Sequence, residues 1–296
     1  MSSSTASTPS AAAAGIIALG DLTVNRLGYG AMRLTGPGIW GPPTHPKQAL
    51  GVLRRAVELG VNFIDTADSY GPYISENLIA EALYPYPSGL VIATKGGWER
   101  FGPGKWTHNA SPRHLEQAVH GSLTRLRVDC IDVYQLHVPD PAVSLEASVE
   151  TLVRLQQNGK IRHIGLSNIS LDQLERARKL TPIVSVQNRY SYADREWDYL
   201  LDHCEQNNIA FIPWAPLGQA QTINGILGRT AKQLNVSPLQ VSLAWLLRRS
   251  KATLPIPGTS SIEHLEENIA TASLQLPDDA FEEMTSVHPP PHSLRA

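Results

Sequence analysis

Eight short apolar runs alternate along this chain with longer segments in which apolar residues recur every three or four positions. Recurrence at that spacing places one apolar stripe along a helix. Near-continuous apolar runs between helices are typical of parallel strands covered on both faces. The runs span residues 26–32, 61–67, 90–95, 130–137, 161–168, 183–190, 209–216 and 253–258. The amphipathic segments include residues 48–59, 112–126, 144–158, 171–180 and 238–250. Eight such pairs within about 250 residues predict an α/β fold closed into a (β/α)8 TIM barrel, in preference to an open doubly wound sheet.

Three segments lie outside the eight pairs. Residues 15–24 place Gly-Asp between two strand-like runs, which predicts an N-terminal hairpin. Residues 278–287 have the pattern of an additional C-terminal helix. Residues 1–14 consist mostly of Ser, Thr and Ala, and we expect a disordered tail. They lack the basic start and the long apolar stretch of a signal peptide. Because no linker interrupts residues 15–296, we expect a single barrel domain there.

Composition narrows the class of function. Lys and Arg total 25 against 27 Asp and Glu, so the chain lacks the basic surplus expected of a nucleic-acid binder. No apolar run approaches the roughly 18 residues that span a bilayer, so no membrane segment is expected. Two cysteines, Cys130 and Cys204, are too few for a disulfide framework, which favours a reducing, cytoplasmic location. The expected partner is a small molecule, and the oligomeric state stays open.

Polar residues gather at the C-terminal ends of the predicted strands, where barrel enzymes carry their reactive groups. Asp65, Lys95 and His137 lie at the ends of the second, third and fourth runs. The next three runs end near Ser167, Asn168, Gln187 and Trp214. Each residue alone has a structural explanation, such as a turn cap, a lysine that reaches solvent or a satisfied buried histidine. Together they would face one narrow mouth where unpaired charges are costly, so Asp65 and Lys95 are expected to neutralise each other.

Tyr70 follows Asp65 by five residues and is expected over the same mouth. A phenol has an ordinary pKa of about 10, and an ammonium at Lys95 predicts a lower value for Tyr70. Asp65 would hold Lys95 charged, and His137 would donate to the same substrate oxygen. This combination suits the protonation of an oxygen that gains negative charge, as happens when hydride adds to a carbonyl.

A metal centre is a weaker interpretation of the same residues. Only Asp65, Asp68 and His137 could serve as ligands, and Lys95 beside them would repel a cation. We therefore expect no metal. A metal-dependent isomerase or hydrolase barrel stays as an alternative that would lose activity on chelation.

Seven segments in order resemble the signatures of the aldo-keto reductase family. They are NFIDTADSYG (62–71), IATKGG (92–97), VYQLH (133–137), GKIRHIGLSN (159–168), VQNRYS (186–191), WAPLG (214–218) and IPGTSSIEHLEEN (256–268). The resemblance covers the chain from about Leu27 to Asn268. Residues 26–43 and 81–87 are most similar to the bacterial pyridoxal-reductase-type members.

The resemblance implies that Tyr70 is the general acid, that Lys95 and Asp65 tune it, and that His137 orients the substrate. It also implies an NADPH cofactor extended across the barrel mouth, with NADH as the alternative. The implied cofactor-binding residues are Ala31, Met32, Asp65, Ser167, Asn168, Gln187, Trp214, Leu217, Gly218, Gly258, Thr259, Ser260, His264, Glu267 and Asn268. No GxGxxG follows any predicted strand, which agrees with a nicotinamide enzyme that is not a Rossmann protein.

Two positions depart from the family pattern. Many members carry a Lys where this chain has Gly258 and an Arg where it has His264. The 2′-phosphate would then be bound by Thr259, Ser260 and a helix start, with help from a protonated His264. Because an ordinary imidazole titrates near pH 6.5, the preference for NADPH over NADH is expected to be modest and to weaken as the pH rises.

Bulky aromatic residues follow several predicted strands. They are Trp40, Trp98, Trp106 and Tyr190, and we expect Trp40, Tyr70, Trp98 and His137 to form the substrate pocket. An apolar aromatic cleft favours aromatic or heteroaromatic aldehydes, pyridoxal among them, over highly charged sugars. The predicted function is NADPH-dependent reduction of an aldehyde or ketone to an alcohol. The alternative is a cofactor-sensing regulatory subunit, because the same fold serves as a partner of potassium channels. The intact set of Asp65, Tyr70, Lys95 and His137 favours the enzyme.

Overall fold

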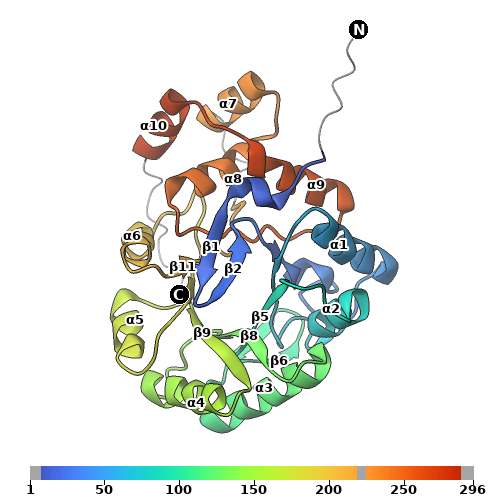
Figure 1. Ribbon diagram of the computed structural model, residues 1–296, viewed down its shortest axis with the longest axis vertical. Coiled ribbons are helices and arrows are strands. Elements are labelled where there is room, and N and C mark those ends of the chain that lie inside the picture. The colour runs from blue at the N-terminus through green and yellow to red at the C-terminus, as the bar shows by residue number, and fades with distance from the viewer. Residues whose placement is uncertain (1–7, 219–224, 288–296) are drawn as a thin grey trace.

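The computed structural model describes residues 8–218 and 225–287, and its main sheet is curled and ringed by helices (Figure 1). Seven parallel strands lie in the order β11-β10-β9-β8-β5-β4-β3. Their bounds are β3 Tyr29–Gly30, β4 Phe63–Asp65, β5 Val91–Gly96, β8 Ile131–Leu136, β9 Ile161–Ser167, β10 Ser185–Gln187 and β11 Ala210–Phe211. Six of them lie within the predicted runs and β5 extends one residue beyond its run, which confirms the assignment of seven of the eight strands.

The eighth predicted strand, residues 253–258, forms a single bridge instead of a strand. The Leu254 amide donates to the carbonyl of Phe211 over 2.8 Å, and the Gly28 amide donates to the carbonyl of Pro255 over 2.9 Å. A proline has no N–H to donate, so the ladder cannot continue along this segment. These bonds nevertheless link the last strand to the first and close the predicted barrel.

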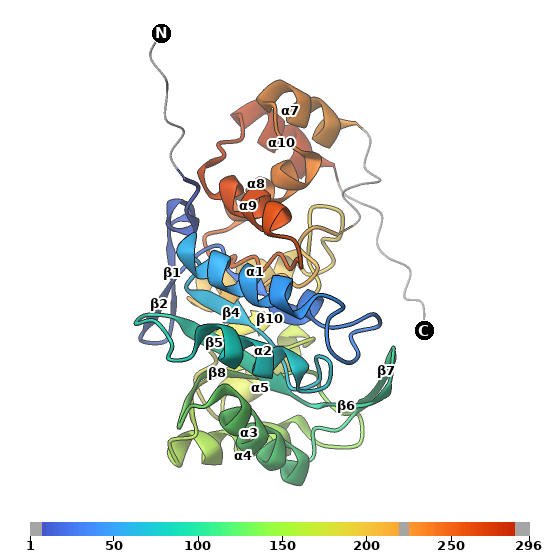
Figure 2. The same ribbon diagram turned by 90° about the vertical axis from the view of Figure 1, so that its right-hand side faces the viewer.

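Helices follow the strands and cover the outside of the sheet (Figures 1 and 2). They are α1 Pro46–Glu58, α2 Ile74–Leu83, α3 Pro112–Leu126, α4 Leu145–Gln157, α5 Leu171–Arg178, α6 Asp198–Gln206, α7 Ile226–Leu234, α8 Pro238–Arg249, α9 Ile262–Ala270 and α10 Asp278–Ser286. The short 3-10 helices are η1 Ala11–Ala14, η2 Ala31–Leu34 and η4 Thr271–Ser273. Serine side chains cap several helices, as where Ser170 and Ser237 form capping boxes at α5 and α8. The predicted C-terminal helix is α10. None of the described helices is long and apolar enough to cross a membrane.

The predicted N-terminal hairpin is present as β1 Ile16–Leu19 and β2 Leu22–Asn25, paired antiparallel. Leu19 and Val24 are fully buried and belong to the same apolar cluster as Phe63 and Val133, from β4 and β8. The hairpin therefore closes the N-terminal end of the barrel, and the C-terminal end is left for the candidate site.

The prediction of a disordered tail over residues 1–14 is wrong for its last part. Residues 11–14 form η1, Ala11 is fully buried, and its amide donates to the carbonyl of Leu59 over 2.8 Å. The small side chain of Ala11 packs beside the end of α1. The expectation of disorder rested on the composition of residues 1–14, and composition does not reveal such a packing contact. Residues 1–7 lie outside the described part of the chain.

A second hairpin, which the sequence analysis did not predict, follows β5. It consists of β6 Trp98–Gly102 and β7 Lys105–His108, and it extends away from the barrel (Figure 2). Arg100 ties it to the neighbouring loops, because its guanidinium donates to the carbonyls of Ser69 (2.9 Å) and Gly38 (3.1 Å). The same guanidinium lies 3.6 Å from the ring centroid of Trp106.

Candidate active site

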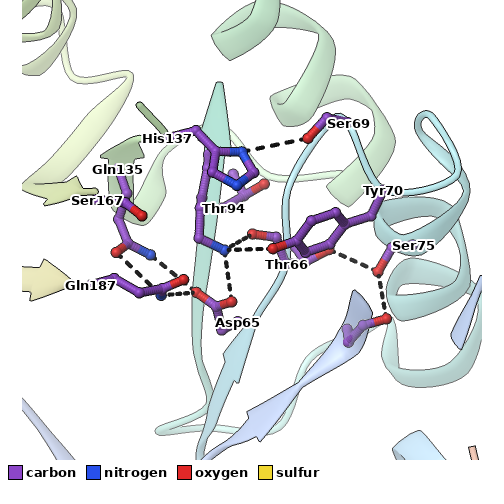
Figure 3. A network of polar contacts seen from close by, with 12 residues as sticks. Asp65, Thr66, Ser69, Tyr70, Ser75, Thr94, Gln135, His137, Ser167 and Gln187 are labelled. Carbon is purple, nitrogen blue, oxygen red and sulfur yellow. Dashed lines mark hydrogen bonds and ion pairs between the residues drawn. The ribbon is translucent and has the colours of Figure 1, made fainter. Parts of the chain in front are cut away.

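The four predicted catalytic residues meet at the C-terminal end of the barrel, where Lys95 contacts both Asp65 and Tyr70. Figure 3 labels Asp65, Tyr70 and His137 in this group. Asp65 ends β4, Lys95 lies near the end of β5, His137 directly follows β8, and Tyr70 lies in the loop between β4 and α2. All four side chains are buried. Side chains alternate between the two faces of a strand, so Asp65, Lys95 and His137 continue inward-facing rows that include the buried residues Phe63, Ala93 and Val133.

Lys95 is the centre of the polar network. Its ammonium donates to Asp65 Oδ2 over 2.7 Å, to the Thr66 carbonyl over 2.7 Å and to the Tyr70 hydroxyl over 3.4 Å. All three N–H groups are therefore used. Burial by itself would lower the pKa of Lys95, but the charge of Asp65 and these hydrogen bonds outweigh it, and the pKa is raised. Lys95 is thus a permanent cation beside Tyr70.

Two glutamine side chains hold the other oxygen of Asp65. Gln135 and Gln187 donate to Asp65 Oδ1 over 3.0 and 2.8 Å. The sequence analysis missed Gln135, although it lies two residues before His137 in β8 and therefore on the same face of that strand. With both carboxylate oxygens engaged, Asp65 keeps one orientation toward Lys95.

The expected lowering of the Tyr70 pKa is not what the structure gives. Burial raises the pKa of Tyr70, while the Lys95 ammonium acts in the opposite direction and Asp65 adds to the rise. Tyr70 is therefore protonated at neutral pH. Its hydroxyl accepts from Lys95 and donates to no residue in the described part of the chain, so its proton is available to a substrate.

His137 is an uncharged donor at the same mouth. Burial, together with the positive charge of Lys95, places the pKa of His137 well below its ordinary value. Nδ1 lies 3.4 Å from the Ser69 hydroxyl, and a proton donated by Ser69 would leave the imidazole proton on Nε2. In Figure 3 the Tyr70 and His137 side chains extend toward each other, with ring centroids 5.8 Å apart.

The residues predicted to bind the nicotinamide carboxamide also lie together. The side-chain Nδ2 of Asn168 donates to the Ser167 hydroxyl over 3.1 Å, and the backbone N–H of Asn168 donates to the backbone carbonyl of Gln187 over 2.9 Å. Trp214 Nε1 donates to Asn168 Oδ1 over 2.9 Å, which fixes the indole beside this group. Asn168 has a positive φ of 58°, a conformation that Asn tolerates better than most residues. Leu217 and Gly218 follow in the turn after Trp214.

Three of the four residues predicted at the adenosine phosphate, Gly258, Thr259 and Ser260, line a cavity of about 650 Å³. Met32, Gly258, Thr259 and Ser260 contribute to it, together with residues 33, 35–39, 43–45 and 48–49 that the sequence analysis did not assign. Ala31 is buried beside Met32 in η2. His264, Glu267 and Asn268 lie on α9, but none of them lines this cavity. The contribution of His264 to cofactor binding stays a prediction.

Two of the predicted pocket aromatics flank the catalytic residues. The Trp98 ring lies 6.3 Å from that of His137, and Trp40 forms a bridge to Gly71, the residue after Tyr70. Tyr190 does not face the mouth as expected. It is fully buried in the core, because its ring packs against Trp245 and its hydroxyl donates to Asp198 over 2.5 Å.

Asp68 is buried close to this site but takes no part in the Lys95 network. Its Oδ1 has no hydrogen-bond partner in the described part of the chain. Burial and the negative charge of Glu76 place its pKa well above the ordinary value, despite Arg125. No group of three or more His, Cys, Asp or Glu able to hold a metal occurs among the described residues.

Asp68→Asn is expected to stabilise the protein increasingly as the pH rises above about 4, the ordinary pKa of an aspartate, by up to about 1.4 kcal/mol per pH unit. The folded protein keeps the Asp68 proton at a pH where the unfolded chain has lost it, so wild-type stability falls as the pH rises. The amide has no proton to lose. Urea unfolding at several pH values measures the difference, with exposed Asp129→Asn as the control. If the difference in unfolding free energy between Asp68→Asn and the wild type does not change with pH, the raised pKa of Asp68 is contradicted.

Known proteins share this sequence and fold. A profile of the Aldo/keto reductase family matches residues 26–289. An uncharacterized oxidoreductase of Schizosaccharomyces pombe is 47% identical over 92% of this chain and 89% of its own length. Pyridoxine 4-dehydrogenase of Escherichia coli is 45% identical over 91% of this chain and 96% of its own length. An aldo/keto reductase from Klebsiella pneumoniae, solved with NADP and acetate, is 26% identical with a TM-score of 0.77 and covers 92% of this chain and 94% of its own. With its barrel and its Asp65–Lys95–Tyr70 network, this chain belongs to the Aldo/keto reductase family.

Proposed function

We propose that this protein is an NADPH-dependent carbonyl reductase that converts an aromatic or heteroaromatic aldehyde to the alcohol. The observation that carries the proposal is the contact of a neutral, buried Tyr70 hydroxyl with the Lys95 ammonium at 3.4 Å. Bound NADPH supplies the hydride in this chemistry. The protein must supply a proton and hold the carbonyl oxygen that receives it.

Tyr70 is the proton donor in this proposal. As its O–H proton passes to the substrate oxygen, a phenolate forms in a buried site. Lys95 stabilises that developing charge, because an ammonium acts strongly on a nearby anion where water is excluded. Asp65 positions Lys95 and balances its charge.

His137 orients the substrate. A neutral imidazole donates one hydrogen bond, and its pKa keeps it neutral across the physiological range. Donation to the carbonyl oxygen from His137 and from Tyr70 would polarise the carbonyl. The oxygen would also be held where Tyr70 can protonate it.

The residues present fit NADPH in two places. Ser167, Asn168 and Gln187 offer amide and hydroxyl groups of the kind that bind a carboxamide, next to the Trp214 indole. The cavity at residues 258–260 offers hydroxyls, a guanidinium and an imidazole. Such groups suit a phosphate.

Pyridoxal is the leading candidate substrate. The E. coli relative, 45% identical, is named for oxidation of pyridoxine, the alcohol that corresponds to pyridoxal. The Trp98 ring lies beside His137, the Trp40 backbone pairs with Gly71, and indole rings suit a flat substrate ring. Aldehyde reduction and alcohol oxidation are the two directions of one reaction.

A panel of substrates tests the proposal. NADPH oxidation is expected to give kcat/KM values for pyridoxal and benzaldehyde at least about tenfold above those for an aliphatic aldehyde or a sugar, as one well-placed ring contact would provide. A chelator in the same assay is expected to leave the rate unchanged. A preference for sugars would overturn the substrate class. Tight NADPH binding with no turnover of any carbonyl would instead support the regulatory subunit.

A further inference from the structure

β3 and the residue before it lie directly against the segment that carries the predicted phosphate-binding residues. The Gly28 amide donates to the Pro255 carbonyl over 2.9 Å, and the Tyr29 hydroxyl donates to the Thr259 carbonyl over 2.6 Å. η2, Ala31–Leu34, follows immediately and carries Arg33. Barrel closure therefore brings the first strand's loop next to residues 256–260.

Gly258 cannot carry a lysine in this structure. A Cβ at position 258 would lie 2.6 Å from the carbonyl oxygen of Gly30, closer than real side chains come to a backbone atom. The same Cβ position lies 3.6 Å from Cγ of Arg33. The side chain of Arg33 thus begins beside the place from which a lysine at 258 would extend.

The surroundings of Arg33 suit an anion. Arg33 and His45 line the cavity of about 650 Å³ together with Thr259 and Ser260, and no Asp or Glu is among the lining residues. The Arg33 side chain forms no hydrogen bond or ion pair with any residue that the structure describes. An exposed guanidinium with no partner, next to hydroxyl groups, is available to a phosphate.

We infer that Arg33 supplies the permanent positive charge for the 2′-phosphate of NADPH, in place of the lysine that Gly258 excludes. This inference rests on the proposed NADPH cofactor. The cavity includes none of the residues around Trp214 and Asn168, so it belongs to the end of the cofactor away from the nicotinamide. His264, the residue first expected to meet the phosphate, is exposed on α9 and does not line the cavity.

Arg33→Met tests the inference by calorimetric binding at pH 8, where an ordinary imidazole is neutral. The dissociation constant for NADPH is expected to rise about 10- to 100-fold, the effect of a lost charge-assisted hydrogen bond. The constant for NADH, which has no 2′-phosphate, should stay within about twofold. The fragment 2′,5′-ADP is expected to lose affinity in the variant, and 5′-ADP is not.

Matched variants separate the outcomes. Arg113→Met removes an exposed arginine from α3, away from the cavity, and should change neither constant. Arg33→Lys keeps the charge and should recover much of the NADPH affinity. An equal loss for NADPH and NADH in Arg33→Met would place Arg33 at the pyrophosphate and overturn the inference. A selective NADPH loss in His264→Ala but not in Arg33→Met would also overturn it. If wild-type protein binds neither cofactor, the proposed function fails instead.

Discussion

Replacing Tyr70 with phenylalanine is expected to lower kcat for aldehyde reduction by about 10²–10⁴, the usual contribution of a positioned general acid. The variant lacks only the hydroxyl that accepts from Lys95 and would donate to the substrate. The buried ring keeps its packing, so the fold should be retained. Stopped-flow and steady-state measurements with pyridoxal and NADPH would give the rate.

The NADPH dissociation constant is the internal control for this variant. It should stay within about threefold of the wild-type value, because the loss concerns proton donation and not cofactor binding. Unchanged kcat in Tyr70→Phe would remove Tyr70 from the mechanism. A loss confined to NADPH affinity would assign Tyr70 a binding role instead.

Lys95→Met is expected to reduce kcat by a similar factor, about 10²–10⁴. Without the ammonium, nothing offsets the burial and the negative charge of Asp65, so the pKa of Tyr70 rises further and proton transfer becomes harder. If Lys95 acts through Tyr70, the double variant Tyr70→Phe/Lys95→Met should be little slower than either single one, because residues that act as a unit are not additive. Fully additive losses would show that the two residues act separately.

Stability must be controlled for the lysine variant. Removing Lys95 leaves a buried carboxylate without its ion-pair partner, which costs about 3–5 kcal/mol. The variant Asp65→Asn/Lys95→Met removes both charges and should recover much of that stability without recovering activity. Thermal unfolding of the three proteins separates a loss of fold from a loss of catalysis. Recovered activity in Asp65→Asn/Lys95→Met would contradict the role given to Lys95.

Local patterns in the sequence predicted most of the fold. Apolar runs and helical periodicity located seven barrel strands and helices such as α3 and α4 nearly at their observed ends, because burial against a core imposes those periods on each element separately. An eighth strand was predicted over residues 253–258, but only a single bridge forms there, since the prolines in this segment have no N–H to donate to a ladder. The β6–β7 hairpin was missed, and it is held in place by hydrogen bonds from Arg100 to loops distant in the sequence.

The sequence by itself determined which catalytic groups stand at strand ends, because the carboxyl ends of parallel strands must meet at one face of a barrel. The tertiary structure alone decided how those groups are charged and what each one touches. The sign of the Tyr70 pKa shift depends on how completely the barrel excludes water. The burial of Tyr190 against Trp245 and the approach of Arg33 to Gly258 depend on contacts between segments far apart in the chain. Such contacts leave no periodic trace in the sequence, because they arise only when the closed barrel brings those segments together.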